Sequence, residues 1–434
     1  MSTGKTIAFT NARLIDPANG LDETGTLIVS DGKIEAIHKK DDKKAKAPAK
    51  AETIDCKGLA LMPGLIDMQV FTGEPGEEHR ETLATASQAA AAGGVTGMAT
   101  MPNTHPVIDD AALVDFITRR ARDTAIVRVH PMAALTRGCD GTQMTEFGLL
   151  SEAGAVGFTD GDRAVMNALT MRRALSYAST FDALIMQHAM DADLQSAGVM
   201  HEGELATRLG LAGIPVAAET TIIDRDLRLV ELTGGRYHIA QISAADSVEA
   251  VRAAKKRGLN VSCGVSATHL MLNENDVENY RSFAKLTPPL RSETDRLALI
   301  AGVADGTIDV IVSGHNPQDA EAKRQPFAQA AYGSVGVETL LPGLLTLHHA
   351  NEIDLTTLLA CVTARPAALL GLSGGTLSVG AEADLALVNI GAPWVVDADA
   401  LRSKSQNAAI DRRKVQGQVM ATYLSGAEIF SRDA

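Results

Sequence analysis

The middle of the chain alternates short apolar runs with stretches whose apolar residues recur at helical spacing. The runs predict eight strands, at residues 65–71, 95–101, 126–133, 155–160, 183–188, 237–242, 259–265 and 308–313. Helices are predicted between them, among others at 82–92, 171–179, 248–257 and 293–304. Eight repeats of strand and helix predict an α/β fold, a TIM (β/α)8 barrel.

Both ends of the chain have a different texture, with short β-rich segments bounded by Gly and Asp. Asp31-Gly32 marks a hairpin near the start, and ADLALVNI and GQVMATYLSG are typical strand segments near the end. We therefore expect one small β-sandwich domain built from both termini, residues 1–61 and 376–434. The barrel is expected to occupy residues 62–375.

The composition of the chain argues against several classes of function. A formal net charge of -13 argues against nucleic-acid binding, which needs concentrated Lys and Arg. The basic run from Lys39 to Lys50 contains two aspartates and is interpreted as a solvated loop. The four cysteines are scattered in apolar surroundings, which is typical of reduced core thiols. No apolar run reaches the ~18 residues of a membrane span, so a cytoplasmic protein without a membrane partner is expected.

In a TIM barrel the chemistry lies at the carboxyl ends of the strands, and polar residues gather there in this sequence. A single His, Asn or Asp at such a place is more often a buried structural residue or a helix cap than a functional group. A catalytic zinc site takes three ligands from His, Asp, Glu or Cys. The best set here is His188 and His315 with Asp160 or Asp162. Amides such as Gln69 and Gln241 are poor zinc ligands.

Ordered segments along nearly the whole chain resemble the dihydroorotases of the amidohydrolase superfamily. They include PGLIDMQVFTGEPG, GGVTGMATMPNTHPVID, GFTDGDRAVMNALTMRRAL, GGRYHIAQIS, PPLRSETDR and DGTIDVIVSGHNP. In that family the first strand carries His-X-His before Leu-Arg-Glu-Pro-Gly, where the histidines bind metal and the arginine holds the substrate carboxylate. The same positions here are Gln69, Phe71 and Gly73.

The resemblance assigns the other family positions as well. The bridging metal ligand of strand four is expected at Gly161, with a register uncertain by one residue. His188 keeps the strand-five ligand, Gln241 replaces the strand-six ligand, and Gly314 replaces the strand-eight aspartate that binds metal and acts as the base. Asn103 keeps a substrate-recognition position, whereas Thr287 stands where the family has asparagine. The expected remnants of the substrate pocket are Asn103, His188, His238, Thr287 and His315.

These replacements predict a pseudoenzyme of pyrimidine biosynthesis that has lost its zinc site and needs no cofactor. Inactive dihydroorotase-like chains support the assembly of aspartate transcarbamoylase in some bacteria, so the resemblance implies that partner and a homo-oligomer. One alternative is an active hydrolase of dihydroorotate or another cyclic amide or lactone, with an atypical, mononuclear or metal-free site; only this alternative implies zinc. Another is a binding module in which Asn103, His188, His238 and His315 sense a pyrimidine intermediate.

Overall fold

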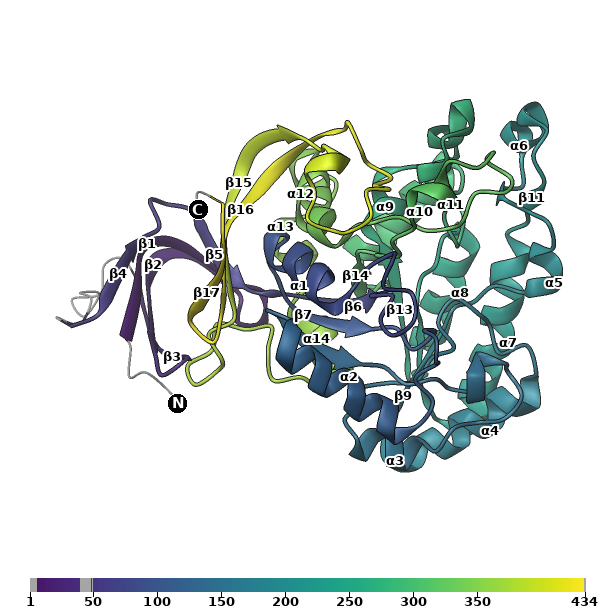
Figure 1. Ribbon diagram of the computed structural model, residues 1–434, viewed down its shortest axis with the longest axis horizontal. Helices are drawn as coiled ribbons and strands as arrows, with labels where there is room; N and C mark the ends of the chain where they lie inside the picture. Colours follow the sequence, from purple (N-terminus) through teal and green to yellow (C-terminus); the bar gives the residue numbers. More distant parts are fainter. Residues whose placement is uncertain (1–5, 40–47, 49, 433–434) are drawn as a thin grey trace.

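The computed structural model describes residues 6–39, 48 and 50–432 (Figure 1). It contains a barrel with surrounding helices and a separate sheet that joins the two ends of the chain. The basic run predicted as a solvated loop lies largely outside the described residues. Within the described chain, no helix is both long and apolar enough to cross a membrane. The four cysteines are buried and unpaired.

The barrel strands form two parallel arcs. One arc has the order β6-β7-β8 and the other has the order β9-β12-β13-β14. Their bounds are β6 Leu65–Val70, β7 Val95–Thr100, β8 Arg128–Pro131, β9 Leu184–Gln187, β12 Arg236–Ile239, β13 Val261–Ser266 and β14 Val310–Val312. The predicted α/β barrel is confirmed.

The arcs are closed by single β-bridges rather than by full ladders. Phe158 bridges both Ala133 and Ile185, and Val70 bridges His315. The predicted strand at 155–160 is therefore reduced to one bridging residue. Its place in the barrel is kept, because the segment bonds to both neighbours. On one side Ala133 N donates to Gly157 O and Thr159 N donates to Ala133 O; on the other, Phe158 N donates to Leu184 O and Met186 N donates to Phe158 O.

Helices cover the outside of the barrel (Figure 1). Their ends follow capping residues: Thr82 and Ser292 each form a capping box, and Asn167 caps through its side-chain oxygen. The helix predicted at 293–304 has these same bounds. The bounds are α1 Leu83–Ala92, α2 Ala111–Thr124, α3 Phe147–Glu152, α4 Ala168–Ala178, α5 Ala192–Gln195, α6 Glu204–Leu209, α7 Ala217–Thr233, α8 Ala245–Lys256, α9 Ala267–Met271, α10 Glu293–Ala304, α11 Ala320–Lys323, α12 Leu340–His349, α13 Leu355–Ala360 and α14 Ala364–Leu370.

The second sheet has eight strands and draws on both termini, with the order β17-β16-β15-β5-β1-β2-β3 and β4 beside β1. Its core includes Phe9, whose ring meets Tyr423 edge to face at 4.9 Å. β5 continues past residue 61, so the sheet reaches beyond the predicted edge of this domain. The bounds are β1 Thr6–Asp16, β2 Leu21–Ser30, β3 Lys33–Lys39, β4 Glu52–Asp55, β5 Ala60–Pro63, β15 Leu385–Val395, β16 Lys414–Leu424 and β17 Ala427–Ser431; the short pair β10 Met200–His201 and β11 Gly213–Ile214 lies elsewhere.

Residues 396–413, which we call the C-terminal strap, leave this sheet between β15 and β16 and return to the barrel. Asn407 Nδ2 donates to Gly333 O at 3.0 Å, and Ala409 N donates to Ser334 Oγ at 2.8 Å. Ser405 Oγ donates to Arg80 O at 2.7 Å. The strap thus bonds to two loops at the carboxyl ends of the barrel strands.

A buried charged network fixes α7 against the loops that follow β12 and precede α10. The Glu219 carboxylate accepts hydrogen bonds from Ser243 N, Ala244 N and the hydroxyl groups of Ser243 and Ser247. The Arg291 guanidinium lies 3.7 Å from it, donates to Ile214 O at 2.7 Å, and is buried with it. Arg291 is therefore a structural residue rather than an exposed surface arginine.

Candidate functional site

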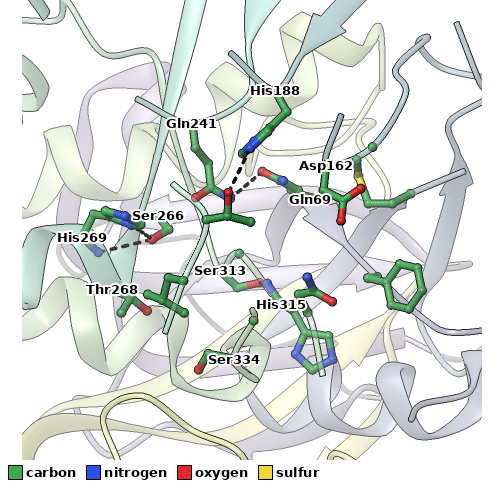
Figure 2. A pocket seen from close by; sticks show the side chains of 18 of the residues that line it. Gln69, Asp162, His188, Gln241, Ser266, Thr268, His269, Ser313, His315 and Ser334 are labelled. Atoms are coloured by element: carbon green, nitrogen blue, oxygen red, sulfur yellow. Dashed lines mark hydrogen bonds between the residues drawn. The ribbon is translucent and has the colours of Figure 1, made fainter. Parts of the chain in front are cut away.

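A pocket opens at the carboxyl ends of the barrel strands, where the fold predicts the chemistry (Figure 2). Strands one, two, five, six, seven and eight all contribute to its wall, together with the segment that follows Phe158. The lining residues are Gln69, Phe71, Met101, Asn103, Gly161, Asp162, His188, Gln241, Ser266, Thr268, His269, Leu286, Thr287, Ser313, Gly314, His315, Asn316, Gly333 and Ser334.

Two amides meet across this pocket. Gln241 Nε2, from the end of β12, donates to Gln69 Oε1, from β6, at 2.8 Å. Figure 2 shows the two side chains pointing toward each other. Gly314 lies beside them: a Cβ built there would be 3.4 Å from Gln241 Nε2 and 3.3 Å from Ser266 Cβ. The strand-one, strand-six and strand-eight positions assigned by resemblance therefore do face one another.

The segment after Phe158 places Asp160 away from the pocket and two of its neighbours in the pocket wall. The Asp160 carboxylate is buried and accepts from Thr136 N at 2.8 Å and Thr136 Oγ1 at 2.5 Å, so Asp160 is not available as a ligand. Burial raises the pKa of this carboxyl group. Gly161 and Asp162 line the pocket instead, and a Cβ on Gly161 would lie 2.4 Å from the Asn103 side chain.

The histidines divide into two groups. His188 lines the pocket, where its Nε2 lies 3.2 Å from Thr287 Oγ1, and burial lowers its pKa. His315 also touches the pocket, but Nδ1 accepts from Gly336 N at 3.2 Å and Nε2 lies 3.5 Å from Glu81. Nδ1 is thus an acceptor, and the buried Nε2 faces Glu81 without a hydrogen bond. His315 is thus held by structural partners.

His238, predicted as a pocket remnant, lies outside the lining. Its ring is fully buried beside β13, where Nδ1 lies 2.8 Å from Ser262 Oγ. Ser266 and His269, at the end of strand seven, line the pocket although they were not among the predicted pocket residues. Their side chains are 2.7 Å apart, and His269 Nε2 lies 3.0 Å from Pro288 O. Their position just after the seventh predicted strand was the available signal.

Acid is expected to destabilise the fold through two histidines outside the pocket, His238, which is buried, and His130, which is partly buried. Burial lowers the pKa of His238 to about 3 and of His130 to about 4. Below the unfolded pKa of about 6.5, the unfolded chain binds protons that the native chain does not, so stability falls as the pH drops toward 4. Each group contributes up to about 1.4 kcal/mol per pH unit.

Urea unfolding at pH 7.5, 6 and 5 measures the slope of the unfolding free energy against pH. A His238→Gln variant should show a flatter slope than the unsubstituted chain, whatever its stability at pH 7.5. An unchanged slope in that variant would show that His238 is protonated in the folded protein.

Comparison with known proteins identifies the family to which the chain belongs. The profile of the dihydro-orotase-like family matches residues 58–247. Over 430 residues the chain is 43% identical to a dihydroorotase of Wolbachia sp. subsp. Drosophila simulans (strain wRi), covering 99% of this chain and 96% of the relative. The chain belongs to the dihydroorotase family. A dihydroorotase of Geotalea daltonii is also 43% identical over 427 residues, covering 98% and 100%.

Among solved structures, the L-hydantoinase (dihydropyrimidinase) of Arthrobacter aurescens superposes with a TM-score of 0.88 at 25% identity. The match covers 98% of this chain and 96% of that one. A dihydropyrimidinase of Brevibacillus agri, with a TM-score of 0.84 at 20% identity, shows the same fold. The chain is therefore a dihydroorotase-like member of the amidohydrolase superfamily.

These relatives correct the expectation that the protein needs no cofactor. Dihydroorotases and hydantoinases are zinc-dependent amidohydrolases, so membership in this family implies a metal. The side chains present do not match the family's donor set. Within the described part of the chain, no group of three or more His, Cys, Asp or Glu residues is arranged to hold a metal ion. In the pocket, the ligand-type groups His188 and Asp162 each make one long side-chain contact: His188 Nε2 lies 3.2 Å from Thr287 Oγ1, and Asn103 Nδ2 donates to Asp162 Oδ1 at 3.4 Å.

Proposed function

We propose that this dihydroorotase homologue does not itself open or close the dihydroorotate ring and that it supports the assembly of aspartate transcarbamoylase. The observation that carries the first part is the set of side chains facing one another in the pocket. Two amides, an aromatic ring and a glycine, namely Gln69, Gln241, Phe71 and Gly314, occupy positions where the family has ligands and a base.

Hydrolysis of a cyclic amide needs a polarised carbonyl group, an activated water and a base. Gly314 has no side chain to accept a proton, and the Asp160 carboxylate is committed to Thr136. Asp162 remains in the wall, 3.4 Å from Asn103 Nδ2, but it lies in the turn after Phe158, whereas the family base follows strand eight. These contacts supply no route to ring opening by the family's chemistry.

A second candidate is an active cyclic-amide hydrolase with an atypical or mononuclear site. It is favoured by the 43% identity to relatives named dihydroorotase. His188 and Asp162 are the side chains on which it depends. The names of the relatives support this candidate more directly, whereas the pocket side chains support the first.

Measurements on a single preparation of the protein distinguish the two candidate functions. Zinc content and dihydroorotate turnover are measured together, before and after incubation with zinc. The first candidate predicts turnover at the background rate in both states, whatever the zinc content. Turnover that rises with bound zinc and is lost in His188→Ala and Asp162→Asn variants establishes the second candidate.

The assembly role is tested by expressing aspartate transcarbamoylase from the same organism with and without this chain. We expect the two proteins to elute together in size-exclusion chromatography, and transcarbamoylase activity to fall several-fold when this chain is omitted. A transcarbamoylase that is fully assembled and active alone contradicts the proposal. The same column, run with this chain by itself, tests the predicted homo-oligomer.

A further inference from the structure

The pocket wall is poor in positive charge. Among its described lining residues there is no lysine or arginine, and Asp162 brings a carboxylate. The three histidines have ring partners in Thr287, in Ser266 with Pro288, and in Gly336 with Glu81. A ligand carboxylate placed here would meet a like charge without a cation to balance it.

The position that holds the substrate carboxylate in the family is closed to any side chain. Gly73 has a φ of +67°, and a Cβ built on it would lie 2.6 Å from Glu77 O and 2.8 Å from Glu81 O. The backbone around residue 73 therefore leaves no room for an arginine there.

Arg80, on the same loop, does not fill the role. Its guanidinium stacks on Phe71, 4.3 Å from the ring centroid. Its nitrogens donate to Pro317 O at 2.9 Å, to Glu77 at 2.5 Å and to Asn316 Oδ1 at 2.7 Å. Glu77 already balances the charge of Arg80, and turning Arg80 toward a ligand would break these hydrogen bonds.

Neutral hydrogen-bonding groups remain free in the pocket. The amide pair uses one donor of Gln241 and one acceptor of Gln69, which leaves Gln241 Oε1 and Gln69 Nε2 for other partners. Asn103 Oδ1 is buried and has no hydrogen-bond partner. Such a buried acceptor is costly unless a ligand or water donates to it.

We propose that this pocket selects uncharged cyclic amides, whose ring N–H and C=O groups match these amides, and rejects ring carboxylates such as dihydroorotate. The inference rests on the proposed function only in that both concern the same pocket; binding selectivity does not require turnover or a partner protein.

Calorimetric titration and thermal-shift measurements on the full chain test it, with dihydrouracil and hydantoin as neutral probes and dihydroorotate and carbamoyl aspartate as anionic ones. We expect the neutral rings to bind at least about tenfold more tightly. Asp162→Asn should narrow that ratio several-fold, because it removes the like charge. Gln241→Leu should weaken the binding of the neutral probes.

Asp224→Asn, which removes an exposed carboxylate from α7, is the control for net charge and should leave the ratio unchanged. Dihydroorotate binding as tight as dihydrouracil binding overturns the proposal, and so does the absence of any response to neutral rings at millimolar concentration. Dihydroorotate turnover and transcarbamoylase assembly are measured separately, so failure of the proposed function is recognised independently of this ratio.

Discussion

Ring opening of dihydrouracil is expected to rise at least about 10³-fold when Gln69→His, Phe71→His, Gln241→His and Gly314→Asp are combined in one variant loaded with zinc. The changed positions face one another around His188 in the wall of a single pocket. In this family such side chains hold the metal that polarises the carbonyl group, and the strand-eight carboxylate acts as the base. The rate of dihydroorotate ring opening should rise less, because Gly73 and Asp162 are unchanged.

The matched control carries the three histidines without Gly314→Asp. It should bind zinc but stay near the background rate, since it lacks the strand-eight carboxylate. The Gly314 backbone has a φ of +62°, which aspartate tolerates better than most residues, and a Cβ there makes contacts no closer than 3.3 Å. A folded, zinc-loaded variant with no gain over this control contradicts the role given to position 314.

Removal of the Glu219 carboxylate by Glu219→Ala is expected to cost about 3–5 kcal/mol of unfolding free energy, because the buried Arg291 charge would lose its partner. The backbone N–H groups of Ser243 and Ala244 would also lose their acceptor. Urea unfolding followed by circular dichroism at pH 7.5 measures the change.

Glu231→Ala is the control, since its ion pair with Arg257 spans 3.4 Å between side chains that are half exposed. We expect a change below about 1 kcal/mol there. If Glu219→Ala were as mild as this control, the buried network would not be a principal support for α7.

Periodicity was sufficient to predict most of the barrel, because strands and helices with one buried face repeat their apolar residues at fixed spacing. The helix at 293–304 is an example, with Ser292 as a readable cap. The fourth strand was over-predicted. Its apolar run lies between the neighbouring strands, but only Phe158 forms β-bridges to both of them, and such pairing is not specified by the run itself.

The pocket shows where sequence reasoning ends. Spacing placed Gln69, Gln241 and Gly314 at strand ends, and they do meet. It did not show that Asp160 turns toward Thr136 or that His238 bonds to Ser262 under the pocket wall, because these depend on side-chain direction. Position along the strand did favour His269. His238 lies near the start of the predicted strand 237–242, whereas His269 follows the seventh predicted strand at its carboxyl end.

The C-terminal strap has a consequence for synthesis of the protein. Gly333 and Ser334 of the pocket wall accept hydrogen bonds from Asn407 and Ala409, which follow them by 74 and 75 residues in the sequence. On the ribosome the barrel strands emerge well before these partners, since domains form progressively as the chain is made. The pocket wall is completed only after residues 407 and 409 have emerged from the ribosome, so a nascent chain stalled before residue 396 has the barrel segments without this support.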